Sequence, residues 1–168
     1  MEFAIISDIH DRVDRLNQCL NILTERGIDT IVFCGDFCSP FVIKVLGESG
    51  KTIHAVFGNN DGDRFHILNQ AQNYPNIRLY GEYIGDTDNI LTLDGVKIGV
   101  THYPFYAQTM VKTGWYDAVF FGHTHKQHKQ KYGKALFMNP GEIAGVLNNP
   151  SFAIYDTVYQ TSEFIELE

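Results

Sequence analysis

The chain has 168 residues, a length that favours one domain and allows a substantial buried core. Hydrophobic residues make up 44% of it and charged residues 20%, which excludes a disordered chain, and no apolar run is long enough to span a membrane. The formal net charge of −7 argues against broad binding to nucleic acid or anionic membranes, although bound cations could still hold a phosphate ligand.

The first third of the chain alternates predicted strands with predicted helices. Short, nearly continuous runs rich in Val, Ile and Phe predict strands covered on both faces at 3–6, 30–34 and 52–57. Residues 11–27 place apolar side chains at helical spacing and end at Gly27, a typical helix stop. Ser39 is predicted to cap a second helix that has Pro40 at its first position.

The later part of the chain has fewer predicted helices and more short predicted strands. Strands are predicted at 96–100 and 118–121, with a helix at 105–113 between them that ends at Gly114. Short apolar runs then predict antiparallel strands at 135–138, 151–156 and 163–168. Together these elements predict a single domain, residues 1–168, with a layered fold of the α/β (α+β) class.

The amino-terminal stretch MEFAIISDIHD has no basic region and carries acidic residues early, so we expect no signal peptide and a cytoplasmic protein. The cysteines are Cys19, Cys34 and Cys38, an odd number without CxxC spacing. This usage fits reduced thiols in a cytosolic protein, and we expect all three to be small core residues.

Five apolar runs end in side chains that could bind a metal. These side chains are Asp8, His10, Asp36, Asn59, His102, His123 and His125. Ligands of open α/β sheets bind at the carboxyl ends of the strands, so the pattern predicts one crevice that collects them all. The pairs Asp8/His10 and His123/His125 are spaced so that both members project to the same side of an extended strand.

The types of side chain in this set indicate the kind of metal site. Carboxylate, amide and imidazole ligands suit borderline divalent ions such as Mn, Fe, Ni, Co or Zn. Seven ligands exceed the number that one four-coordinate site uses, which favours two ions sharing a carboxylate. Asp36 is the natural bridge because it stands alone on its loop. A single His is more often structural, but five such strand ends in one chain reverse that expectation.

The motifs resemble those of the calcineurin-like metallophosphoesterases. The matching stretches are Asp8-x-His10, Gly35-Asp36, Gly58-Asn59, His102 and Gly122-His123-x-His125. The NPGE stretch at 139–142 looks like the closing part of the small phosphodiesterase branch, so the resemblance covers essentially the whole chain. It implies a four-layer α/β/β/α sandwich.

The resemblance also divides the ligands between two divalent ions, with manganese as the first choice and Ni, Fe, Co, Zn or Mg as alternatives. One ion would be held by Asp8, His10, Asp36 and His125. The other would be held by Asp36, Asn59, His102 and His123. Asp36 and His102 would act in catalysis through the metals, and the implied activity is phosphodiester hydrolysis by a hydroxide that the dinuclear centre activates.

Two departures from the family pattern bear on the substrate. Many members have a His after the ligand Asn, whereas this chain has Asn60, which can contact phosphate but cannot act as a general acid. Tyr103-Pro104 follows His102, where the family usually has Gly directly after the His; the loss of this Gly stiffens the loop, and Tyr103 is a candidate for the substrate entrance. A phosphomonoesterase and a protein-interaction scaffold without efficient catalysis remain the alternatives.

Other polar residues are assigned simpler roles. Structural or solvated roles are favoured for His54 and His66, and surface exposure is favoured for Arg12 and Arg64, which follow metal-site loops. His128 lies in a solvated stretch whose lysines could steer an anionic substrate. We expect a small phosphodiester as the partner, with no broad nucleic-acid binding and no membrane, and the sequence leaves a homo-oligomer open.

Overall fold

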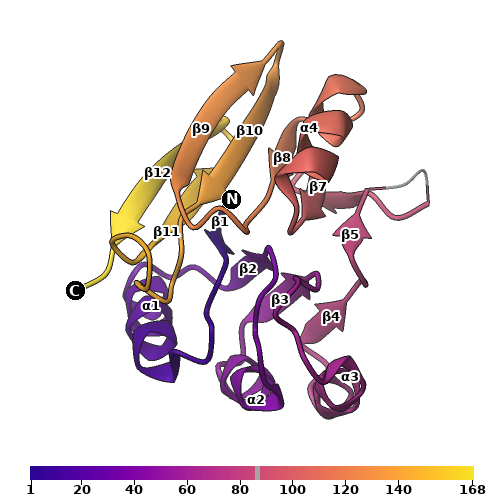
Figure 1. Ribbon diagram of the computed structural model, residues 1–168. Helices are drawn as coiled ribbons and strands as arrows, with labels where there is room; N and C mark the ends of the chain where they lie inside the picture. Colours follow the sequence, from indigo (N-terminus) through magenta and orange to yellow (C-terminus); the bar gives the residue numbers. More distant parts are fainter. Residues whose placement is uncertain (86–87) are drawn as a thin grey trace.

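The computed structural model describes residues 1–85 and 88–168, which form two β-sheets lying face to face with helices on their outer sides (Figure 1). The first sheet has the order β12-β11-β1-β2-β3-β4. Its strands are β1 (Glu2–Ile6), β2 (Thr30–Phe33), β3 (Thr52–Ala55), β4 (Ile77–Leu79), β11 (Ser151–Asp156) and β12 (Thr161–Glu166). Strands β1 to β4 are mutually parallel, and β11 runs antiparallel to both β1 and β12.

The second sheet has the order β5-β7-β8-β10-β9, and β6 also pairs with β7. Its strands are β5 (Tyr83–Ile84), β6 (Leu91–Leu93), β7 (Val96–Thr101), β8 (Ala118–Phe120), β9 (Gln127–Tyr132) and β10 (Ala135–Pro140). Strands β7, β8 and β10 are parallel, whereas β5, β6 and β9 are antiparallel to their neighbours. The helices are α1 (Val13–Glu25), α2 (Pro40–Glu48), α3 (Arg64–Ala71) and α4 (Pro104–Lys112).

Three buried apolar clusters separate the layers. Along β1, Ala4 and Ile6 face the cluster shared with α1, α2 and α3, while Phe3 and Ile5 face the cluster between the sheets. This alternation follows from the two-residue period of a strand. A third cluster joins α4 to the outer face of the second sheet, as its members Ala107 and Val119 illustrate. The predicted four-layer α/β/β/α sandwich is therefore confirmed (Figure 1).

The sequence-based expectations differ from the structure in several local details. Ser39 occupies the N-cap position of α2, but its hydroxyl donates a hydrogen bond to Asp11 Oδ1 at 2.6 Å and does not cap the helix. The run at 135–138 pairs antiparallel with β9 but parallel with β8. Cys19 and Cys34 are buried as expected, whereas the expectation was wrong for Cys38, which is only half-buried. Within the described residues, no helix combines the length and apolar character needed to cross a bilayer.

Candidate metal centre

The predicted ligands come together where the carboxyl edges of the two sheets meet. Asp8 and His10 follow β1, Asp36 follows β2 and Asn59 follows β3, so these four come from the first sheet. The remaining three follow strands β7 and β8 of the second sheet, and they are His102, His123 and His125. Two sheets thus share the cluster, whereas the sequence pattern alone suggested the edge of one open sheet.

The first group of ligand atoms surrounds Asp8. Asp8 Oδ1 lies 3.4 Å from His125 Nε2 and 3.7 Å from His10 Nε2. The His10 and His125 rings stack with their centroids 5.0 Å apart. Asp36 joins this group because its Oδ2 lies 3.5 Å from His10 Nε2.

The second group surrounds Asn59. Asn59 Oδ1 lies 2.7 Å from His123 Nδ1 and 2.9 Å from His102 Nε2. Asp36 also belongs to this group, because its Oδ2 lies 3.4 Å from His102 Nε2. The same carboxylate oxygen therefore faces both groups, as a bridging ligand must.

The spacing of these atoms fits coordination of a cation. Two atoms that each lie about 2.1 Å from one ion are about 3.0–3.4 Å apart at octahedral to tetrahedral angles. The His–carboxylate distances of 3.4–3.7 Å begin at the upper limit of this separation and exceed the length of a charge-assisted hydrogen bond. Asp8 Oδ1 and His10 Nε2 are also buried without a hydrogen-bond partner. Buried polar atoms normally have partners, so these two have the character of ligand atoms for a metal ion.

The backbone is strained at this cluster. Five of the seven residues have positive φ angles, and these are Asp8 (53°), His10 (45°), Asp36 (65°), His123 (69°) and His125 (61°). Residues other than glycine rarely adopt this left-handed conformation, which costs roughly 1–3 kcal/mol where it occurs. The fold keeps this unfavourable conformation at the residues that turn their side chains toward one point.

Hydrogen bonds to the far sides of two rings fix which nitrogen faces the cluster. His102 Nδ1 lies 2.8 Å from the carbonyl oxygen of Cys34, and His125 Nδ1 lies 2.9 Å from Glu142 Oε2. A ring that donates through Nδ1 keeps the lone pair of Nε2 free for a metal. His10 is oriented differently, because its Nδ1 lies 3.4 Å from Cys38 Sγ.

Two buried carboxylates that support the cluster were missed in the sequence analysis. Asp61 accepts hydrogen bonds from the backbone N–H groups of Gly58, Cys38 and Asp36, and so ties the loop after β2 to the loop after β3. Glu142 accepts from His125 and from three backbone N–H groups of the loop at 146–148. The sequence signal that could have identified them is the acidic residue inside each of two glycine-containing motifs. These motifs are GNNDG, which contains Asp61, and NPGE, which contains Glu142.

The charges at the cluster suit cation binding. Burial raises the pKa of Asp36, but His102 and Asn60 outweigh it and hold this pKa well below its ordinary value. Burial lowers the pKa of His102, but Asp36 and Asp8 outweigh it and leave this pKa raised. The neighbouring carboxylate of Asp8 raises the pKa of His10, and the charge of Asp36 adds to this effect. Asp36 is therefore ionised at neutral pH, as a metal ligand has to be.

Asn60 and Tyr103 lie beside the candidate ligands, as the sequence predicts. Asn60 donates to both oxygens of Asp36, from its backbone N and from Nδ2, each at 2.8 Å. Tyr103 lies beside two of the candidate ligands, with ring centroids 5.3 Å from His102 and 5.8 Å from His123. The phosphate contact of Asn60 stays a prediction, and the structure gives its amide a second task at Asp36.

The two arginines that follow the loops are half-buried, not fully exposed, and each holds backbone. Arg12 pairs with Asp14 and donates to the carbonyl oxygen of Ala144 at 3.1 Å. Arg64 pairs with Glu82 and donates to the carbonyl oxygen of Gly58 at 2.8 Å. Both guanidinium groups therefore already have carboxylate partners.

Gly58 leaves no room for a side chain. A Cβ atom at this position would lie 2.1 Å from Asp36 Oδ1 and 2.7 Å from the Asp36 backbone N. Gly62, four residues later, has no atom within 4 Å of its own Cβ position and no positive φ. The two glycines therefore form a matched pair for testing how tightly the loops pack.

We expect Gly58→Ala to destabilise the protein and Gly62→Ala to leave it nearly unchanged. Forcing a methyl group against a fixed backbone atom costs about 1–3 kcal/mol. In a chain of this size that is a fall of about 3–10 °C in Tm, measurable by thermal unfolding followed by circular dichroism. Equal Tm values for the two variants would show that the loop at Asp36 is looser than the structure indicates.

Known proteins share the sequence pattern and the fold of this chain. The family model of the calcineurin-like phosphoesterase superfamily domain matches residues 1–160. The chain is 31% identical to Phosphodiesterase MJ0936 of Methanocaldococcus jannaschii over 171 aligned residues, covering 100% of both chains. A solved archaeal phosphodiesterase superposes with a TM-score of 0.89 at 30% identity, covering 99% of this chain and 100% of that one. Vps29 of Entamoeba histolytica shares the fold, with a TM-score of 0.67 at 18% identity and full coverage of both chains.

Proposed function

Because this chain belongs to the calcineurin-like phosphoesterase superfamily, we propose that it is a phosphodiesterase whose two-metal centre is held by the strand-end side chains. The observation that carries this proposal is that two groups of ligand atoms meet at a single oxygen, Asp36 Oδ2. Asp8, His10, Asp36 and His125 would hold one ion. Asp36, Asn59, His102 and His123 would hold the other.

The catalytic chemistry divides between the ions and the chain. When bound, the two divalent ions would activate a water and neutralise charge on the phosphoryl oxygens. Asp36 supplies the shared negative charge, and its low pKa keeps it ionised. His102 presents Nε2 because its Nδ1 donates to the carbonyl oxygen of Cys34. Asn60 holds both oxygens of Asp36 and is therefore first of all a positioning residue.

The substrate class follows from the group that the chain lacks at this position. Asn60 has no titratable proton to give to a leaving oxygen. Hydrolysis of diesters with good leaving groups, or with water as the proton source, is therefore favoured over hydrolysis of alkyl monoesters. The amide Nδ2 would contact phosphate only if it left Asp36 Oδ2, to which it donates at 2.8 Å.

Several finer expectations belong to this proposal. Manganese is the first choice among the borderline divalent ions, because the ligand set mixes carboxylate, amide and imidazole groups. The reduced cysteines support a cytoplasmic protein, and the shared core supports a single domain over residues 1–168. The net charge of −7 supports a small phosphodiester as substrate in place of a nucleic acid bound along its length.

Metal-stripped protein assayed with chromogenic esters tests the function. We expect turnover of bis(p-nitrophenyl) phosphate on adding Mn²⁺ or Ni²⁺, and much weaker turnover of p-nitrophenyl phosphate. Turnover confined to the monoester would replace the proposed reaction by phosphomonoester hydrolysis. If neither ester reacts with Mn²⁺, Ni²⁺, Mg²⁺ or Zn²⁺, the chain uses the fold as an interaction scaffold.

A further inference from the structure

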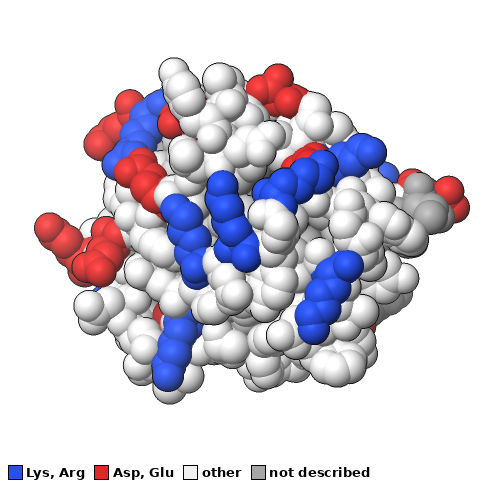
Figure 2. Space-filling view, turned by 90° about the horizontal axis from the view of Figure 1, so that it is seen from above, with Lys and Arg blue, Asp and Glu red and all other residues white. Residues whose placement is uncertain are grey.

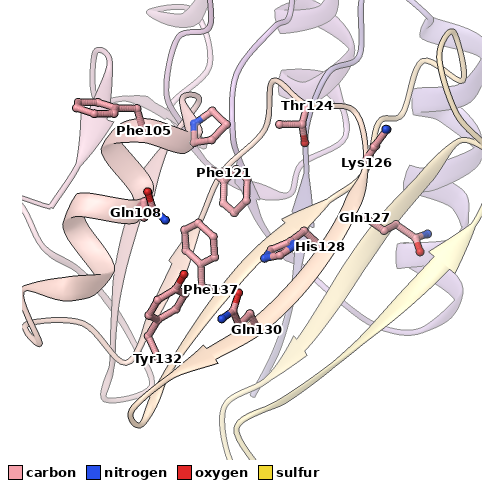
Figure 3. A pocket seen from close by; sticks show the side chains of 11 residues that line it. Phe105, Gln108, Phe121, Thr124, Lys126, Gln127, His128, Gln130, Tyr132 and Phe137 are labelled. Carbon is pink, nitrogen blue, oxygen red and sulfur yellow. The ribbon is translucent and has the colours of Figure 1, made fainter.

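A groove of about 510 Å³ lies next to the candidate metal centre, between α4 and β9 (Figure 3). Figure 3 shows Phe121 and Phe137 between the two elements, with Phe105 and Gln108 on the helix side. The remaining lining residues are Pro104, Thr124, Lys126, Gln127, His128, Gln130 and Tyr132. The volume lies within the usual range for small-molecule sites, roughly 300–1,000 Å³.

The groove and the candidate metal centre are built from the same loops. Thr124 lines the groove and stands between the candidate ligands His123 and His125. Pro104 lies two residues after His102 and begins α4. Asn139 Nδ2 holds the start of the groove in place by donating to Thr124 Oγ1 at 3.0 Å. The groove therefore begins at the loops that carry His102, His123 and His125.

The floor of the groove is aromatic. Phe121 and Phe137 stack with ring centroids 4.5 Å apart and an interplanar angle of 25°, and they are only 3% and 6% exposed. His128 and Tyr132 meet Phe137 edge-on, at centroid distances of 5.6 and 5.5 Å. At the rim, the ring of Phe105 is 76% exposed. An aromatic floor with a further exposed aromatic side chain at its rim favours a planar ligand that gains by stacking.

The walls of the groove add hydrogen-bonding groups. The side chains of a strand alternate between its faces, so His128, Gln130 and Tyr132 line the groove while Lys129 donates from the opposite side to Ser162. Gln108 faces them from α4 (Figure 3). Carboxamides both donate and accept hydrogen bonds, which matches the mixed edge of a nucleobase.

Positive charge borders this part of the molecule although the chain as a whole is acidic. The exposed residues at the start of the β9–β10 hairpin include Lys126, which lines the groove. Seen from above, the face toward which this hairpin projects carries a band of Lys and Arg side chains, with acidic groups mainly toward its edges (Figures 1 and 2). Lys126, which lines the groove itself, favours an anionic ligand over a neutral aromatic one.

We propose that the groove binds the base of a nucleoside phosphodiester, so that the preferred substrates carry a nucleoside on the phosphate. The proposal rests on the proposed function, because the metal centre has to hold the phosphate while the groove holds the base. Phe105 would act as a specificity residue that stacks on the base, and Gln108 and Gln130 would contact its edge.

Two esters with the same leaving group test the proposal. Thymidine 5′-(p-nitrophenyl phosphate) and p-nitrophenyl phosphorylcholine both release p-nitrophenolate, and only the first carries a base. We expect KM for the thymidine ester to be about tenfold lower, because stacking on one aromatic side chain contributes roughly that factor or more. Phe105→Ala should raise KM for the thymidine ester about tenfold, with KM for the choline ester and kcat for both unchanged.

Tyr159→Ala is the matched control, since Tyr159 is also 76% exposed. It lies in the β11–β12 turn beside Thr157, whose backbone N–H donates to Met1, at the end of the sheet away from the metal centre. This variant should change neither KM. An equal rise of both KM values in Phe105→Ala would overturn the proposal, because it would place the nitrophenyl group in the groove.

Binding to metal-free protein separates failure of this proposal from failure of the proposed function. Thymidine 5′-monophosphate added to the stripped protein should give saturation-transfer NMR signals from its base, weakened in Phe105→Ala and retained in Tyr159→Ala. Base signals without turnover of either ester would contradict the proposed enzyme function and support base binding in the groove. Turnover of both esters with equal KM values, and no base signal, would contradict base binding in the groove and support the proposed enzyme function.

Discussion

The Asp36→Asn variant is expected to lose phosphodiesterase activity by about 10³-fold or more, corresponding to about 4 kcal/mol of transition-state stabilisation. The carboxylate oxygen Oδ2 lies 3.4–3.5 Å from Nε2 of both His102 and His10, so one substitution affects both groups of ligand atoms. The substitution also removes the negative charge that two cations would share.

An amide cannot keep the geometry of Asp36 even though its shape is the same. Asn60 donates to Oδ1 from its backbone N and to Oδ2 from Nδ2. Whichever way an amide is turned at position 36, its NH₂ group faces one of these donors. The side chain therefore has to rotate or give up a hydrogen bond, which adds to the loss of charge.

Metal content and rate should be measured together on Asp36→Asn after dialysis against Mn²⁺. We expect the bound metal to fall along with activity toward bis(p-nitrophenyl) phosphate. Asp29→Asn is the control, because Asp29 is 87% exposed, pairs with Lys51 and precedes β2, at the opposite end of that strand from Asp36. A full complement of metal with a wild-type rate in Asp36→Asn would refute the bridging role.

The sequence predicts the ligand cluster well because each candidate ligand follows a strand, and the end of an apolar run marks where such a strand ends. Val, Ile and Phe runs mark β1, β2 and β8 clearly, and the chain must leave the sheet at their ends. Spacing does not predict which sheet a strand joins. The meeting of His102 and Asp36 across two sheets depends on sheet packing and appears only in the three-dimensional structure.

Several missed elements lack apolar periodicity, and two others, β4 and β6, have only three residues each. Strand β9, QHKQKY, has exposed residues along almost its whole length, so no buried face marked it as a strand. Helix α3 buries only Ile67 and Ala71, and β5 has two residues. Each of these elements is held by neighbours already in place, such as β10 for β9, and tertiary pairing is invisible to local patterns. This is also why the groove beside β9 could not be read from the sequence.

Asp61 and Glu142 escaped prediction for a different reason. Their partners are mainly backbone N–H groups of loops, which carry no residue-specific signal. A buried carboxylate surrounded by such donors acts as a rigid connector between loops, because leaving any of these donors unpaired is costly. A substitution of Glu142 is therefore expected to affect metal binding although Glu142 is not a candidate metal ligand.

We expect Glu142→Gln to weaken metal binding by about 10–100-fold and to destabilise the metal-free protein. Glu142 Oε2 accepts from His125 Nδ1 and Val146 N, while Oε1 accepts from Leu147 N and Asn148 N. Glutamine has one oxygen, so its NH₂ group must face one of these pairs. If it faces His125, the imidazole loses the acceptor that keeps Nε2 directed toward Asp8.

Stability and metal binding together distinguish this role from that of a ligand. Leaving two buried donors unpaired costs about 2–4 kcal/mol, a fall of about 5–10 °C in the Tm of metal-free Glu142→Gln. His125→Ala should instead lose metal affinity with a much smaller change in that Tm, because the loop at 146–148 keeps its acceptor. Glu48→Gln is the control, because Glu48 is exposed and pairs with Lys44 on α2, and it should match the wild type in both measurements. If Glu142→Gln had the same Tm and the same metal affinity as the wild type, the loop at 146–148 and His125 would be held by packing alone. The hydrogen bonds to Glu142 would then not determine the geometry of the cluster.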